Sequence, residues 1–141
     1  MVCATVLCMV ALAGPASGVA PDAQWFTLEE EPGHTTGNVI QLRPEPVSID
    51  DRVMLQLRVS LDAQRTSFRG QKYRSYEAKV VVNCTTRNAW YLWLSYYAAP
   101  RWAGPSIARE EYTEGEAPVL FKGIPGESYK RIIAAACKRE S

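Results

Sequence analysis

The side chains suited to acid–base catalysis are few in this chain of 141 residues and form no recognisable catalytic pattern. His34 is the only histidine, and it lies in EEEPGHTTG, whose proline and glycines predict a loop. Ser-His-Asp or Cys-His chemistry needs the histidine held by a third group, and the sequence indicates none. Glutamates at 29–31 and 110–116 could supply paired carboxylates, but charge runs are usually solvated faces. We therefore predict no enzyme activity and no cofactor.

The four cysteines offer thiol chemistry, and their positions favour a disulfide over a metal site. Cys3 and Cys8 fall inside an uncharged N-terminal segment, so removal of that segment would leave Cys84 and Cys137. An even pair in an exported chain indicates a disulfide. Two cysteines and His34 without close spacing do not make a zinc motif. We predict a Cys84–Cys137 disulfide and no metal ion.

The first 20 residues, MVCATVLCMVALAGPASGVA, are typical of a secretory signal peptide. A short apolar run is followed by small residues and Pro15, and no charged side chain precedes or interrupts it. The run is too short to span a bilayer. We expect residues 1–20 to be a signal peptide, residues 21–141 to form a single domain, and no segment to cross a membrane.

The overall charge is balanced, but one segment is strongly basic. The formal net charge of +1 argues against a nucleic-acid-binding protein. Residues 64–74, QRTSFRGQKYR, contain no acid and four cations, which are Arg65, Arg69, Lys72 and Arg74. The segment links two expected strands, so we predict an exposed hairpin loop that could contact sulfated glycans, lipopolysaccharide phosphates or an acidic protein surface. An ordinary solvated hairpin is the alternative.

Period-2 alternation predicts the strands that must position these residues. Residues 52–61 alternate, and one face carries Val53, Leu55, Leu57, Val59 and Leu61. Residues 73–84 alternate in the same way, with Cys84 on the apolar face. Shorter strands are expected at residues 24–28, 38–42 and 107–112. Two prolines exclude residues 43–51 from a central strand.

The C-terminal segment changes to a helical period. An apolar stripe follows i, i+3, i+4, i+7, i+8 spacing through Tyr129, Ile132, Ile133, Ala136 and Cys137. Pro125 suits the first helical position, and Lys138 and Arg139 suit the last turn. Because both cysteines lie on apolar faces, the disulfide should tether the helix to the sheet. The predicted fold class is α+β: an antiparallel sheet of five or six strands with one C-terminal helix packed on one face.

Residues 88–102, NAWYLWLSYYAAPRW, hold three of the four tryptophans and predict a strand with aromatic side chains on both faces. Strict alternation gives two sets, which are Trp90, Leu92, Leu94 and Tyr96 on one face and Tyr91, Trp93, Ser95 and Tyr97 on the other. The preceding TTRN turn does not fix which set joins the core. One helix covers one side only, so we expect exposed aromatics that mark a partner site. The alternative is that a loop or the N-terminal segment covers them.

The ordered set YRSYEAKVVVNC, SYYAAP and FKGIPGESYKRIIAAAC resembles the surface-adhesin protein E family of Gram-negative bacteria. The residues that carry the resemblance are Tyr73-Arg74-Ser75, Cys84, Tyr96-Tyr97, Pro125 and Cys137, and it covers roughly Trp25 to Cys137. The resemblance implies an antiparallel sheet with a helix tethered by a disulfide to its concave side. It also implies a dimer-forming outer-envelope protein, and the founding member of the family is an adhesin for host extracellular-matrix proteins.

We therefore predict a non-enzymatic, adhesin-like binding protein that is exported to the periplasm or outer-membrane surface of a Gram-negative bacterium. It would present a sheet surface and the basic loop to a macromolecular partner such as a host extracellular-matrix protein, and could form a homodimer. The candidate partner-binding residues are Arg65, Arg69, Lys72, Arg74, Trp90, Tyr91, Trp93 and Tyr97.

Two alternatives remain open from the sequence. One is a periplasmic inhibitor or small-ligand-binding protein, which a pocket lined by Tyr76 and Tyr129 between helix and sheet would favour. The other is a hydrolase that uses the glutamates. Glu110 and Glu111 lying in open solvent, far from a cleft, would argue against the hydrolase.

Overall fold

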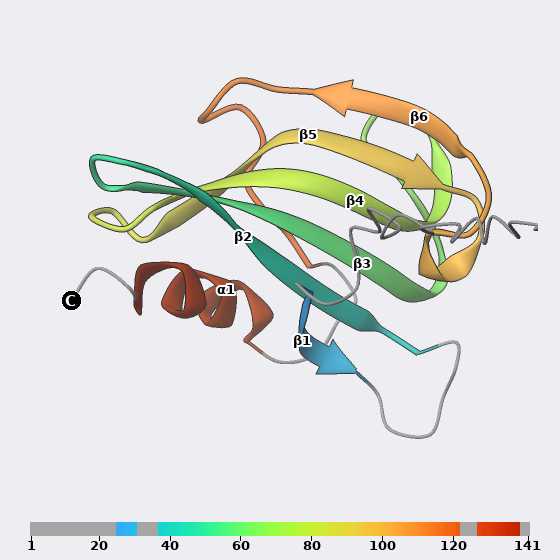
Figure 1. Ribbon diagram of the computed structural model, residues 1–141. Helices are drawn as coiled ribbons and strands as arrows, with labels where there is room; N and C mark the ends of the chain where they lie inside the picture. The colour runs from blue at the N-terminus through green and yellow to red at the C-terminus, as the bar shows by residue number, and fades with distance from the viewer. Residues whose placement is uncertain (1–24, 31–36, 122–126, 139–141) are drawn as a thin grey trace, which may run out of the picture.

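A computed structural model shows six antiparallel strands that follow one another across a single sheet in chain order (Figure 1). It describes residues 25–30, 37–121 and 127–138, so the predicted signal peptide, His34, Pro125 and Arg139 lie outside the described residues. The elements are β1 (Phe26–Glu30), β2 (Val39–Ile49), β3 (Arg52–Thr66), β4 (Lys72–Asn83), β5 (Asn88–Tyr97), β6 (Ser106–Glu111) and the helix α1 (Ser128–Cys137). The predicted α+β fold is confirmed, with six strands.

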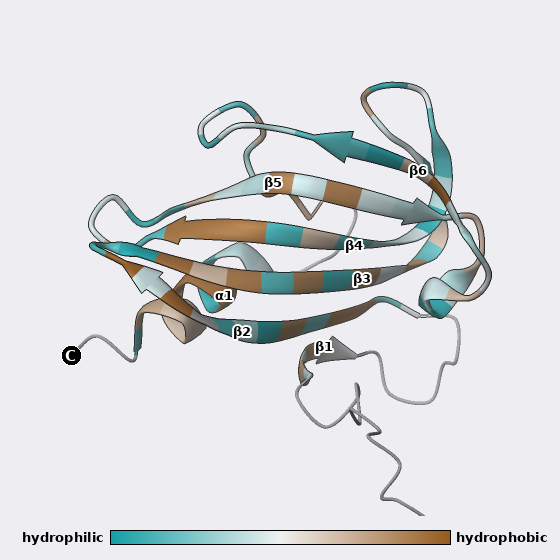
Figure 2. Cartoon of the chain, turned by 45° about the horizontal axis from the view of Figure 1, so that its top comes forward, coloured by the Kyte–Doolittle hydropathy of each residue, from teal (hydrophilic) through white to brown (hydrophobic). Residues whose placement is uncertain are grey.

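β3 and β4 lie at the centre of the sheet, and their alternating side chains show which of its two faces is apolar. Leu55, Leu57 and Val59 of β3 are buried with Ala78 and Val80 of β4, as their alternation predicts. Figure 2 shows this alternation as apolar and polar bands along β3. We call the side that carries these apolar residues the core face and the opposite side the outer face.

The helix α1 packs on the core face, on the side of the sheet near β1 and away from β6 (Figure 1). Ile132 and Ile133 are buried in the hydrophobic core, each contributing roughly 1.5–3 kcal/mol by the usual value for a buried aliphatic side chain. The helix begins at Ser128, with Glu127 as its N-cap. Its apolar stripe therefore lies where the sequence predicts it.

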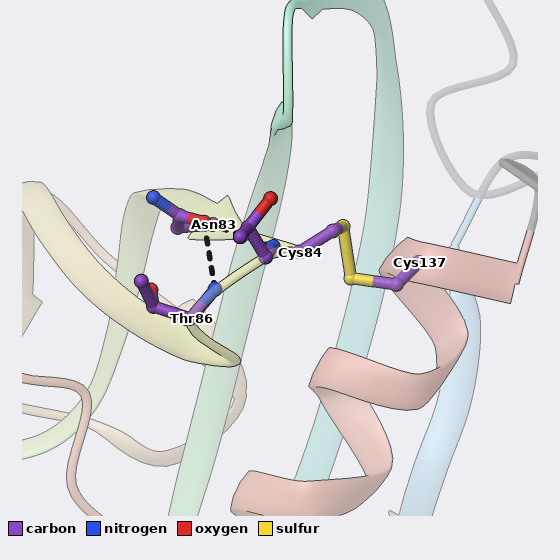
Figure 3. The surroundings of a disulfide bond; sticks show 5 residues. Asn83, Cys84, Thr86 and Cys137 are labelled. Carbon is purple, nitrogen blue, oxygen red and sulfur yellow. Dashed lines mark hydrogen bonds between the residues drawn. A yellow bond between two sulfur atoms is a disulfide. The ribbon is translucent and has the colours of Figure 1, made fainter.

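The Cys84–Cys137 disulfide joins the end of β4 to the last residue of α1 (Figure 3). The two Cα atoms are 5.6 Å apart, within the range that disulfides adopt without backbone movement. The predicted tether between sheet and helix is confirmed.

The two prolines that follow the predicted short strand at residues 38–42 lie within β2 instead of a loop. β2 continues through Pro44 and Pro46 to Ile49, although its pairing with β1 ends at Leu42. Beyond that residue the described strands pair β2 with β3 alone, and the register shifts between Pro44 and Ser48. Proline is tolerated there because an edge or bulge needs no donated N–H. β2 is therefore longer than the predicted strand at residues 38–42, and among the described strands its proline-containing part pairs on one side only, as at the edge of a sheet.

One extra residue in β5 decides which aromatic side chains are buried. Trp93 pairs with Lys79, but the next residue of β4, Val80, pairs with Tyr91. Leu92 is therefore the extra residue of a β-bulge. The other edge of β5 changes partner at the same place: β6 pairs with residues 93–97, whereas residues 117–119 hydrogen-bond to residues 89 and 91.

The bulge makes the predicted division of this strand into two strictly alternating faces wrong. Tyr91, Leu94 and Tyr96 are buried together on the core face. Trp90, Trp93 and Tyr97 are half-buried, and their partners on β4 place them on the outer face. Tyr91, a candidate partner-binding residue, is only 7% exposed and belongs to the core. Each predicted set contributes residues to both faces.

Candidate functional site

The outer face of β4, β5 and β6 combines an aromatic ring with charges of both signs. The guanidinium carbon of Arg109 lies 4.4 Å from the ring centroid of Trp93, and its Nε lies 3.2 Å from a carboxylate oxygen of Glu111. Lys79 is the neighbour of Trp93 on β4. The Arg109 and Glu111 side chains are largely exposed, so their ion pair contributes about 1 kcal/mol or less to stability. The ion pair in this cluster lies at the surface and contributes little to the stability of the fold. We call this cluster the Trp93 face.

A second aromatic–cation cluster lies on the outer face of β2 and β3. The guanidinium carbon of Arg58 is 4.3 Å from the ring centroid of Trp25 and 4.2 Å from that of Trp102. Arg43 approaches the Trp25 ring to 4.8 Å. The Trp102 indole N–H also donates to two backbone carbonyls of the β3–β4 pair, at 3.2 and 3.0 Å. Arg58 is therefore enclosed between two indoles, a cation–π arrangement that makes it part of the fold.

The turn η2 (Pro100–Trp102) is held over the outer face by two buried serines. The Ser75 hydroxyl donates to the Ala99 carbonyl at 2.7 Å and accepts the Trp102 N–H at 3.0 Å. Ser60 Oγ accepts the Arg101 N–H at 2.9 Å. Arg101 and Trp102 both have positive φ, which costs on the order of 1 kcal/mol or more for each non-glycine residue. The serine hydrogen bonds offset that cost and position the Trp102 ring.

The cations of the predicted basic loop differ in their surroundings. Arg65 lies 3.3 Å from a carboxylate oxygen of Asp62. Arg74 points its guanidinium at backbone carbonyls, donating to residues 61 and 62 at 2.8 and 2.9 Å. Arg69 instead lies over the Tyr112 ring, 5.3 Å from its centroid. Arg65 and Arg69 line the same cleft on the core face, whereas the Arg74 guanidinium is held by backbone carbonyls, and Trp93 does not line that cleft.

The tip of the β3–β4 hairpin presents Phe68, which is fully exposed, to solvent. The Ser67 N–H donates to the Gln71 carbonyl at 2.7 Å, and its hydroxyl accepts the Gln71 N–H at 3.0 Å. Gly70 adopts a φ of 87°, which suits glycine. Lys72 is exposed at the start of β4. Phe68 is not among the residues predicted from the sequence, although a single large apolar side chain in a polar turn was the signal that could have identified it.

A cleft of about 590 Å³ opens on the core face between the hairpin tip and residues 116–121. Five tyrosines line it: Tyr73, Tyr76, Tyr91, Tyr96 and Tyr112. Phe68, Arg65 and Arg69 contribute to the lining from the hairpin. The small-ligand alternative predicted Tyr76 and Tyr129 in such a pocket, but only Tyr76 lines this cleft. Tyr129 accepts the Ala89 N–H at 3.0 Å and lines a neighbouring hollow.

Hydrogen bonds between buried groups fix the tyrosine hydroxyls. The Tyr91 hydroxyl donates to the Leu120 carbonyl at 3.4 Å, so Tyr76 is the donor in the 2.8 Å bond between the Tyr76 and Tyr91 hydroxyls. Burial raises the pKa of both phenols well above the ordinary tyrosine value. Burial and the Glu110 carboxylate also raise the pKa of Tyr96. These side chains are neutral at physiological pH.

Glu110 and Glu111, the residues of the hydrolase alternative, lie on opposite faces of the sheet. Glu110 pairs with Leu94 of β5 and is 3% exposed, and its Oε2 accepts the Tyr112 hydroxyl at 3.0 Å. Its Oε1 has no hydrogen-bond partner among the described residues. Glu111 pairs with Trp93 and points into solvent. The sheet therefore separates the two carboxylates, and they do not form a catalytic pair.

A family model described as surface-adhesin protein E matches residues 25–138. The chain belongs to the surface-adhesin protein E family. The matched span holds both disulfide cysteines, the Trp93 face and the cleft. Family membership supports an adhesin-like surface or exported protein with a non-enzymatic role and a protein partner.

Comparison with curated proteins and with solved structures finds no match to the chain. Among the described residues of this adhesin-family chain, no helix is long and apolar enough to cross a membrane.

Proposed function

We propose that this protein is an adhesin-like envelope protein that binds a protein partner, such as a host extracellular-matrix protein, through the Trp93 face. The observation that carries the proposal is the half-buried Trp93 ring, stacked with Arg109 and flanked by Lys79 and Glu111 on the outer face. Tryptophan, tyrosine and arginine are the residues that most often dominate the binding energy of protein interfaces. Trp90 and Tyr97 extend the same face along β5.

The charge pattern of this face favours a protein partner over a polyanion. Each of the two strands that flank β5 carries a cation and an acid on this face, at positions 79 and 77 of β4 and at positions 109 and 111 of β6. A protein surface of mixed charge can complement such a pattern, whereas a sulfated glycan or lipopolysaccharide phosphate favours a field of one sign. The hairpin cations do not add to this face, because Arg65 and Arg69 line the cleft on the core face and Arg74 donates to the carbonyls of residues 61 and 62.

A homodimer through the Trp93 face is part of the proposal. Burying a tryptophan and its neighbours against a second copy would use the same aromatic surface that a partner would use. Sizing of the mature protein, wild type against Trp93→Ser, tests this part: a dimer that becomes a monomer supports it, and an unchanged dimer assigns self-association to another surface.

The variant Trp93→Ser/Arg109→Glu should weaken binding to an extracellular-matrix protein at least about tenfold. A hot-spot side chain at an interface contributes roughly 2 kcal/mol or more, and tenfold corresponds to about 1.4 kcal/mol. The measurement is surface plasmon resonance of the mature protein against a panel of purified matrix proteins, with circular dichroism of each variant to confirm its fold.

The matched control is Lys130→Glu, which reverses an exposed charge on α1, away from the Trp93 face. It should leave binding unchanged. Equal affinity of the wild type and the Trp93→Ser/Arg109→Glu variant would reject the Trp93 face. If Arg69→Glu/Lys72→Glu loses binding and the other variants do not, the partner binds at the hairpin. If the wild type binds no matrix protein, that class of partner is rejected.

A further inference from the structure

The tyrosine-lined cleft lies on the other side of the sheet from the Trp93 face and has no part in the proposed adhesive contact. Its volume of about 590 Å³ falls within the usual range for small-molecule sites, roughly 300–1,000 Å³. The helix does not cover it, because its lining comes from the sheet, the β3–β4 hairpin and residues 112–121. The cleft is therefore a second candidate site with its own chemistry.

The cleft offers mainly aromatic rings, since three of its five tyrosine hydroxyls already make hydrogen bonds within the protein. The Tyr73 and Tyr96 ring centroids are 4.6 Å apart, and Tyr76 meets Tyr73 edge-on at 5.9 Å. The Tyr76 and Tyr91 hydroxyls are joined to each other, and that of Tyr112 donates to Glu110. Aliphatic side chains complete the lining, including Val59, Leu61, Leu94 and Leu120. Such walls favour an apolar body with an aromatic ring that can meet tyrosine edges and faces.

The rim of the cleft carries cations that can receive an anionic group. Arg65 and Arg69 line the hairpin side, together with the hydroxyls of Thr66 and Ser67. The ion pair of Arg65 with Asp62 is solvent-exposed, so little free energy opposes its exchange for a ligand anion. Glu116 is the acid in the described lining, and its carboxylate stays charged while it accepts hydrogen bonds from the N–H and hydroxyl of Thr113. The two arginines outnumber this one acid, so the lining still carries an excess of positive charge.

The buried carboxylate of Glu110 sets the orientation of a ligand. Glu110 is buried and does not line the cleft itself, but its carboxylate accepts a hydrogen bond from the hydroxyl of Tyr112, which does. An anion next to Tyr112 and Glu110 would be repelled, whereas an anion beside Arg65 and Arg69 would be attracted. The described charges therefore favour an anionic group at the two arginines.

We propose that the cleft binds a small amphipathic anion, with an aromatic body inside the tyrosine walls and a single carboxylate, sulfonate or phosphate head at Arg65 and Arg69. The aromatic walls, the arginine rim and the volume together select this class of ligand. This binding activity is separate from the proposed adhesive contact and does not depend on it.

Titration with 8-anilinonaphthalene-1-sulfonate, an aromatic monoanion that fluoresces in apolar sites, tests the proposal on the mature, disulfide-bonded protein. We expect saturable binding of one dye per chain. Arg65→Glu/Arg69→Glu should weaken it about tenfold, because two attractive charges become repulsive. The neutral analogue N-phenyl-1-naphthylamine should bind with an affinity that the charge reversal leaves unchanged.

Ala117→Phe adds a ring to the cleft lining and should weaken both dyes. Thermal unfolding of each variant must remain cooperative, since a loosened protein also binds such dyes. Lys130→Glu and Trp93→Ser lie outside the cleft lining and should leave dye binding unchanged, which separates this proposal from the adhesive one. The proposal is overturned if neither dye binds, if the charge reversal leaves the affinity of the anion unchanged, or if Ala117→Phe has no effect.

Discussion

Replacing Cys137 with serine should lower the free energy of unfolding by about 4 kcal/mol under oxidising conditions. The disulfide closes a loop between residues 53 positions apart, and it restricts the unfolded chain by an amount that grows with loop length. For a domain of this size the loss corresponds to a fall in Tm of roughly 10–20 °C. Guanidinium unfolding followed by circular dichroism measures it.

The effect should be large because the tether point is rigid. The Cys84 N–H donates to the Asp51 carbonyl at 2.8 Å, and Asn83 Oδ1 accepts the Thr85 N–H at 3.0 Å. Asn83 Oδ1 also accepts the Thr86 N–H at 3.0 Å (Figure 3). The α1 amides should therefore exchange faster in the variant while those of β3 and β4 stay protected. The control is the reduced wild type, which should approach the variant in stability. Free Cys84 and Cys137 thiols in the native protein, or an unchanged Tm, would contradict the tether.

Raising the pH above about 10 should destabilise the protein by about 1.4 kcal/mol per pH unit for each of Tyr76 and Tyr91. Burial raises the pKa of both phenols, so the folded chain keeps two protons that the unfolded chain releases near pH 10. Because the unfolded state then binds fewer protons, stability falls as the pH rises. The stability that the two protonated phenols contribute is fully present below about pH 10. It decreases as the pH rises from there toward their raised pKa values in the folded protein.

The measurement is the free energy of unfolding from guanidinium titrations at several pH values between about 9 and 12. Tyr91→Phe removes one of the two buried phenols, so its slope against pH should be shallower by about 1.4 kcal/mol per unit, although the lost hydrogen bond lowers its stability near pH 7 by about 1 kcal/mol. The same slope in wild type and Tyr91→Phe would show that the Tyr91 phenol ionises in the folded state.

The sequence predicts the parts of the fold that depend on local periodicity. The alternation of β3 and β4 identifies the buried residues Leu57 and Val80, and the helical stripe identifies Ile132. The pairing is predicted from the two cysteines outside residues 1–20, and the periodicities predict that it tethers helix to sheet, since Cys84 and Cys137 each lie on an apolar face. These predictions are reliable because a regular strand or helix fixes the direction of each side chain from its spacing alone.

The parts that the sequence could not predict depend on contacts between distant segments. The bulge at Leu92 lies where β5 changes partner from β6 to residues 117–119, and no property of residues 88–97 alone shows that change. The enclosure of Arg58 brings together three residues from separate segments of the chain, which are Trp25, Arg58 and Trp102. The cleft likewise forms only when β4, β5 and residues 112–121 come together.

The different surroundings of the hairpin cations have a similar cause. Cations that are close in the sequence can point the same way in a flexible loop, but Arg65 and Arg74 belong to the paired strands β3 and β4, which fix the directions of their side chains. Arg74 then finds backbone carbonyls, Arg65 finds Asp62, and Arg69 at the turn lies over Tyr112. The basic sequence of residues 64–74 therefore predicts that cations lie at this end of the sheet, but it does not predict where their side chains point.

The central claim is that the bulge at Leu92 turns Trp93 outward and that this face meets the partner. Hydroxyl-radical footprinting, which labels side chains according to their exposure, tests it directly on the mature protein, free and bound to a matrix partner. In the free protein, diluted until it is monomeric, we expect Trp93 and Tyr97 to be labelled and Tyr91 to be protected. On binding, the labelling of Trp93 and Tyr97 should fall while that of Phe68 stays the same. Protection of Phe68 with unchanged labelling of Trp93 would contradict the account.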